Sequence, residues 1–315
     1  MVDSEYLTKG LYALARAHHV NTMAGHLGAA IVAGCLITEN HPNLDEKVCV
    51  GIKAELDRII CGESVFSPGK NAAIQVNEMF DPLPKAPSKE NLIDRIADAL
   101  VYNINQTRQS GHNVIFAAIA IRALKRYPEF ANPAITDGIR KLIAGFNGVT
   151  PGVAYYGKEK GRIDGRKIVL HEDGTFPPYT DLQTMVTTVL DTLIQHAAER
   201  RQGFGGLWHV INHAAALSEL AQHGYQELAI TGLTAHHQHL QLWKTLPNVA
   251  DELGAEVPTK HDPRLPIYWQ SDDLRRDCAR LTHRIKTLYG FDTLVNLVED
   301  RAKREQGYDK LRYLM

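Results

Sequence analysis

The chain has 315 residues, of which 44% are hydrophobic and 23% charged, and its formal net charge is −1. This length and balance are typical of a soluble globular protein with one large domain or two small ones. A net charge near zero gives no general attraction to nucleic acid or to an anionic membrane, so neither is expected as a partner.

Cysteine usage and the first residues indicate the compartment. The four cysteines form no CxxC pair, which is typical of reduced thiols in a cytosolic protein. Met1–Glu5 contains no basic segment followed by an apolar core, so a secretory signal is not expected. The longest apolar stretch, Ala29–Ile37, is too short to span a bilayer. We therefore expect a cytoplasmic protein.

Periodic apolar residues predict helices along most of the chain. Ser4 is a plausible N-cap for the first helix, and Gly25 separates it from a second that is apolar all round and is therefore expected to be buried. The predicted helices cover 5–20, 26–38, 45–60, 88–106, 112–124, 133–144, 182–201, 208–223 and 225–246.

Three longer segments interrupt or follow these helices. The insertion 149–179 contains a predicted β-hairpin, in which Arg166–His171 pairs with Thr175-Phe176 across Glu172-Asp173-Gly174. A linker with three prolines covers 256–269, and a charged helical segment covers 271–315. Together with the helices, these segments predict one helical domain over residues 1–315.

A repeat centred on histidine organises the helices. Gly25-His26 opens an apolar run, and Gly111-His112 opens another 86 residues later; His26 to Pro42 and His112 to Pro128 both span 16 positions. A third copy contains Gly206 and His209, so the repeat units cover about 4–62, 88–148 and 180–246. One buried helix per unit predicts an all-α fold, either an α/α toroid or a curved helical array, with an irregular bundle as the alternative.

The repeat histidines are the leading catalytic candidates. If the units are related by a rotation, His26, His112 and His209 converge near one axis. His213 follows His209 by four residues, which places both rings on one helix face and makes this pair the candidate metal site. The four imidazoles would hold a divalent transition metal or act as acid and base. In the alternative interpretation each histidine only caps its helix.

Other candidates lie around these histidines. The glycine-bracketed loop with Tyr155 and Tyr156 is expected to close on a small-molecule substrate, and Arg108 and Trp208 are expected to contact it. His236–His239 falls on a predicted outer helix and is interpreted as a solvated or interface cluster. Asp272–Asp277 resembles a magnesium-diphosphate motif, but acidic residues in a first helical turn also complement the helix dipole.

The histidine-led helical segments resemble those of the questin oxidase-like proteins. The resemblance lies in Gly25–Ala30, Gly111–Ile115 and His209–Ala215. It implies an oxygenase that oxidises a polycyclic ketone with a reduced nicotinamide. No Walker, GxGxxG, GxSxG or HExxH motif is present.

The sequence leaves three functions open. The first is a small-molecule enzyme with a histidine-lined cavity, an oxidoreductase, for which a homo-oligomer is also possible. The second is a non-catalytic helical scaffold that binds a protein. The third is a sugar hydrolase, lyase or epimerase, which would need carboxylates in the cavity; the loosely placed candidates are Asp57, Asp137, Asp181 and Glu199.

Overall fold

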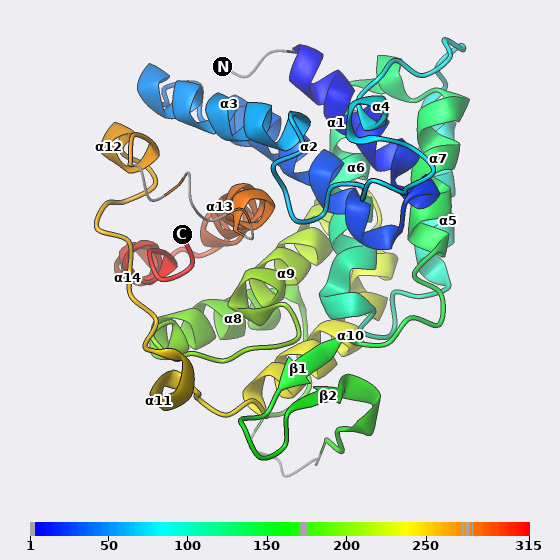
Figure 1. The fold of residues 1–315 in the computed structure, drawn as a ribbon. Helices are drawn as coiled ribbons and strands as arrows, with labels where there is room; N and C mark the ends of the chain where they lie inside the picture. The colour runs from blue at the N-terminus through cyan, green and yellow to red at the C-terminus, as the bar shows by residue number, and fades with distance from the viewer. Residues whose placement is uncertain (1–3, 171–175, 272–273, 275–277, 279) are drawn as a thin grey trace. The chain divides into compact units, whose positions relative to one another are not determined.

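A computed structural model describes the chain except residues 1–3, 171–175, 272–273, 275–277 and 279 (Figure 1). The described residues form an all-α protein with one small β-hairpin, which confirms the predicted fold class. The chain is divided into two compact units. Unit 1 contains 1–100, 116–145 and 261–289, and unit 2 contains 101–115, 146–260 and 290–315.

Unit 1 is built around the apolar helix α2 (Gly25–Asn40), which is buried from Gly25 to Thr38. Helix α1 (Ser4–Arg16) lies against α2 and also against α7 (Pro133–Ala144), and α3 (Glu46–Ile60) covers another part of α2 (Figure 1). The segment Thr22–Asn40 is long and apolar enough to cross a membrane, but 83% of that window is buried inside the protein. Its apolar surface is therefore accounted for by packing.

The shorter helices of unit 1 complete its surface. Helix α12 (Pro266–Trp269) packs on α3, where Gly51 makes room for the Trp269 side chain. The other helices are α4 (Val76–Met79) and α5 (Asp94–Val101). Two longer helices, α6 (His112–Arg126) and α13 (Leu281–Val295), contain the unit boundaries at 115/116 and 289/290.

The central element of unit 2 is α9 (Gly206–Gln222), which is buried at nearly every position from Leu207 to Leu220. It lies between α8 (Leu182–His196) and α10 (Gln226–Lys244), and α14 (Arg301–Leu311) packs on α8. The one-turn helix α11 (Ala250–Leu253) follows α10. The predicted apolar helix of the third repeat is thus the core helix of this unit.

The β-hairpin lies in the predicted insertion but not at the predicted residues. Strand β1 (Val153–Tyr155) pairs antiparallel with β2 (Arg162–Asp164), with Ala154 opposite Ile163. Two glycines at positive φ, Gly157 and Gly161, close the turn. The proposed strand at 166–171 is wrong, because Gly165–Lys167 forms a 3-10 turn, and its proposed turn and partner strand lie mostly outside the described residues.

Three buried helices, α2, α6 and α9, begin at or close to the three histidine signatures of the sequence, and the repeat itself stays a prediction. The unit boundaries do not follow the repeat boundaries, since the second repeat is divided within α6. The toroid and the single domain over 1–315 both stay predictions.

Candidate active site: a histidine cluster in unit 2

The repeat histidines share one hydrogen bond. His26 Nδ1 lies 2.8 Å from the Met23 carbonyl oxygen and His209 Nδ1 lies 2.7 Å from that of Gly205; His112 Nδ1 bonds in the same way to Gln109. A carbonyl oxygen can only accept, so each Nδ1 carries the proton. Each ring thus donates to a backbone carbonyl near the start of its helix, and in an uncharged ring the lone pair then lies on Nε2.

Two of these Nε2 atoms meet inside unit 2. His112 Nε2 and His209 Nε2 are 2.9 Å apart, and each side chain is 3% exposed. Because both rings already use the Nδ1 proton, two lone pairs would face each other at this distance. The contact is favourable only with a cation between the nitrogens, either one shared proton or a metal ion. At a metal–nitrogen distance of about 2.0–2.1 Å, this separation corresponds to an N–metal–N angle of about 90°.

Glycines at unusual backbone conformations set the positions of these rings. Gly111 precedes His112 with φ +82°, and a Cβ there would lie 2.6 Å from His213 Cγ. Gly205 precedes α9 with φ +70°, and a Cβ there would lie 2.2 Å from His209 Cγ. Only glycine fits at either position, for conformational and steric reasons together.

A second pair of imidazoles lies beside the first. His213 Nδ1 is 3.3 Å from His239 Nδ1, and His239 Nε2 is 2.8 Å from the Phe204 carbonyl oxygen. His239 therefore donates from Nε2 and accepts at Nδ1, so His213 donates from Nδ1. The remaining His213 Nε2 is a buried lone-pair nitrogen with no hydrogen-bond partner among the described residues.

His236 extends the cluster towards the surface. Its Nε2 donates to the Val210 carbonyl oxygen at 3.0 Å, so its Nδ1 accepts from the Tyr179 hydroxyl at 3.1 Å. The His236 and His213 ring centroids are 5.1 Å apart. The interpretation of His236–His239 as a solvated cluster is wrong: His236 and His239 are fully buried, because α10 packs on α9 and is also covered by Phe176 and Tyr179.

Burial keeps these rings neutral. It lowers the pKa of His236 to about 3 and that of His239 to about 4. Burial also holds the pKa of His213 well below its usual value, with the neighbouring His236, His239 and His112 acting in the same direction. His213, His236 and His239 are therefore uncharged imidazoles at neutral pH, which is the state that binds metals and accepts protons.

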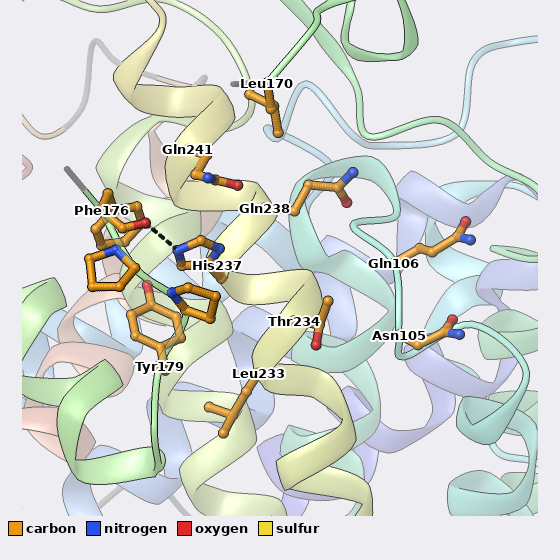
Figure 2. Close-up of a pocket in the computed structure, with 12 residues that line it drawn as sticks. Asn105, Gln106, Leu170, Phe176, Tyr179, Leu233, Thr234, His237, Gln238 and Gln241 are labelled. Carbon is orange, nitrogen blue, oxygen red and sulfur yellow. Dashed lines mark hydrogen bonds between the residues drawn. The ribbon is translucent and has the colours of Figure 1, made fainter. Parts of the chain in front are cut away.

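A pocket of about 860 Å³ in unit 2 is lined in part by Tyr179 and His237 (Figure 2). Apolar and aromatic groups form one part of its wall and carboxamides another, and none of the described residues that line it is an acid, lysine or arginine. Tyr179 lines the pocket and bonds to His236, which connects the pocket to the cluster. The lining residues are Asn105, Gln106, Leu170, Phe176, Pro177, Pro178, Tyr179, Leu233, Thr234, His237, Gln238 and Gln241.

The predicted catalytic residues are distributed between the units. His112, His209 and His213 belong to unit 2 and are brought together there, whereas His26 belongs to unit 1. The convergence of all four on one axis stays a prediction. Sequence reasoning missed Tyr179, and it placed His236 and His239 outside the site.

The predicted substrate-binding residues make structural contacts. The Tyr155 hydroxyl donates to Glu252 at 2.7 Å, and the Tyr156 hydroxyl bonds to Thr245. Arg108 donates to the Val149 carbonyl oxygen, and Trp208 Nε1 donates to that of Leu314. None of these four is among the residues that line the pocket, and their role in substrate binding stays a prediction.

Comparison with known proteins gives no relative: no family model matches the chain, and no curated protein and no solved structure matches it.

Proposed function

We propose that the protein is a metal-dependent enzyme acting on an uncharged small molecule, with His112 and His209 of unit 2 as metal ligands. The observation that carries the proposal is the 2.9 Å contact between their Nε2 atoms, with both Nδ1 atoms donating to backbone carbonyls. Metal-binding histidines commonly have their second nitrogen fixed in this way, because it sets the tautomer and aims the lone pair.

Capping alone does not account for this geometry. The bond to a backbone carbonyl uses only Nδ1 of each ring, so it does not require the two Nε2 atoms to lie in contact. A scaffold protein would gain nothing from two buried lone pairs directed at each other. A shared proton is the competing explanation, and it would make the pair an acid–base catalyst instead of a metal site.

The pocket supports the substrate class. Its volume of about 860 Å³ is within the usual range for small-molecule sites. Carboxamides such as Gln238 and Gln241 both donate and accept hydrogen bonds, and the described part of the wall contains no acid, lysine or arginine to neutralise an ion. We therefore infer an uncharged ligand with hydroxyl or carbonyl groups, consistent with an oxidoreductase that acts on a ketone.

Metal analysis tests the proposal. The purified protein is expected to contain about one transition metal ion per chain, and His112→Gln and His209→Gln are each expected to lose it. His19→Gln is the matched control, because His19 is exposed and belongs to unit 1. His213→Gln tests the ligand pair that the HxxxH spacing predicts, and it should retain the metal if His112 and His209 hold it.

The identity of the metal then separates reaction classes. Iron or copper would favour oxidation, and zinc would favour hydrolysis or hydration. A wild-type protein that binds no metal on titration with Fe²⁺, Cu²⁺ or Zn²⁺ would overturn the proposal, and so would full metal content in both His112→Gln and His209→Gln.

A further inference from the structure

Lys286 is an unusual residue of unit 1. It lies on α13, is 1% exposed, and its Nζ has no hydrogen-bond partner among the described residues. The Phe116 ring lies near it, with its centroid 5.6 Å from Nζ. Burial lowers the pKa of Lys286 well below its ordinary value, which favours the neutral amine. A lysine buried without a partner is rare in proteins, so the residue calls for an explanation.

A second cation on α13, Arg284, differs from Lys286 in its partners. Arg284 is also buried, but it pairs with Glu55 at 2.9 Å and donates to the Leu274 carbonyl oxygen at 3.1 Å. A structural cation in this interior is therefore neutralised and hydrogen-bonded. Lys286 Nζ has no hydrogen-bond partner among the residues that the structure describes, and an apolar residue of similar size would cost less to bury.

Two imidazoles accompany Lys286. His283 precedes it by three residues, so both side chains project from one side of α13. The His283 ring lies 5.0 Å from the His26 ring, and ring nitrogens of the two lie within 4.8 Å of one another. The Phe116 ring, 5.4 Å from His26, links this pair to Lys286. The cluster thus contains a buried amine and two imidazoles, whose ring nitrogens can donate and accept protons.

We propose that Lys286 is a nucleophile that forms an imine with a small, uncharged aldehyde or ketone. The Nζ lone pair forms a bond to the carbonyl carbon, and a proton passes from nitrogen to the carbonyl oxygen to give a carbinolamine. Loss of water then breaks the carbon–oxygen bond and leaves the imine. His283, three residues earlier on the same side of α13, is the side chain that we assign to the proton transfers.

Reductive trapping on the whole protein tests this assignment. The protein is incubated at pH 7 with glycolaldehyde and cyanoborohydride, and each lysine is then followed by peptide mass spectrometry. An exposed lysine has only about one neutral amine in two thousand at this pH. Lys286 is therefore expected to be alkylated at least tenfold faster than the exposed Lys47 and Lys85.

The variants separate catalysis from structure. Lys286→Met is expected to lose this labelling, to keep its metal content and to melt at a higher temperature than the wild type. His283→Gln is expected to slow labelling of Lys286 at least threefold while leaving Lys47 unchanged, and His19→Gln, at an exposed position of unit 1, should leave all labelling unchanged. The proposal is overturned if Lys286 reacts no faster than Lys47 in the native protein, or reacts only after denaturation.

Discussion

The histidines of unit 2 differ in chemistry because different ring nitrogens are occupied. His112 and His209 donate from Nδ1 and present Nε2, whereas His236 and His239 donate from Nε2 and accept at Nδ1. In every case a backbone carbonyl fixes the tautomer, because it can only accept a hydrogen bond. The same residue type thus supplies paired basic nitrogens at one position and an acceptor for the Tyr179 hydroxyl at another.

Single-residue changes at the Glu55–Arg284 pair should be costly. Burial raises the pKa of Glu55, and Arg284 opposes that rise, so the carboxylate depends on its partners. Arg284→Met is expected to lower the free energy of unfolding by about 3 kcal/mol, measured by urea denaturation, because it leaves a buried carboxylate with less compensation. Arg166→Met should change it by less than about 1 kcal/mol, since its pair with Asp164 is exposed.

A double variant completes this test. In Glu55→Met with Arg284→Met neither charge of the pair remains, so the loss should be smaller than the sum of the two single losses. Additive losses would contradict the view that the two side chains stabilise each other.

The glycine of the Gly-His signature is required for different reasons in the first two helices that carry it. Gly25 has an ordinary helical backbone, and a Cβ there would lie 2.6 Å from the Phe116 ring. Gly111 instead needs its positive φ, and a side chain there would strike His213. The repeated glycine therefore lets a helix begin in close contact with an aromatic ring, even though the backbone requirement differs between copies.

The crossing of α1 and α2 depends on close backbone approach. A Cβ at Gly28 would lie 2.4 Å from the Gly10 carbonyl oxygen and 2.5 Å from the Leu14 nitrogen, and neither backbone atom can rotate away. Gly28→Ala is therefore expected to lower the free energy of unfolding by about 3 kcal/mol, by forcing the helices apart. Gly69→Ala is the matched control, with nothing within 4 Å of its Cβ, and should stay within about 0.5 kcal/mol. Equal losses in a denaturation series would rule out this account of the crossing.

For the whole molecule, the neutral histidines predict a stability that depends on pH. His236 and His239 have folded-state pKa values of about 3 and about 4, below the unfolded value near 6.5. Between the folded-state and unfolded-state pKa values the unfolded chain binds more protons than the folded chain. These two histidines therefore lower the free energy of unfolding as the pH drops below about 6.5, and they leave it nearly constant above that pH. Each of the two histidines should lower the free energy of unfolding by about 2 kcal/mol between pH 7 and pH 5.

Chemical denaturation at pH 7 and pH 5 measures this effect. The fall in unfolding free energy should be reduced in His239→Gln relative to the wild type, whereas His19→Gln should show the full fall. A wild-type protein equally stable at both pH values would contradict the buried, neutral state of these rings.

The residue pattern is sufficient to predict the helical fold class and the three buried helices. Helical periodicity and all-apolar runs are local properties, so α2, α6 and α9 could be recognised without any knowledge of their neighbours. The sequence also singled out His112, His209 and His213. The hairpin was predicted at the wrong residues, because the residue pattern does not show which glycines adopt the positive φ that the turn needs.

Long-range packing determines which imidazole nitrogens lie in contact. Whether α10 faces solvent depends on what covers it, and Phe176 and Tyr179 cover His236 and His237 from a distant part of the chain. The 2.9 Å contact of His112 with His209 joins residues 97 positions apart. The surroundings of Lys286 Nζ, in which no described residue forms a hydrogen bond with it, are likewise a property of the folded chain. Burial and long-range contact determine tautomer, charge and reactivity, and neither can be read from local sequence.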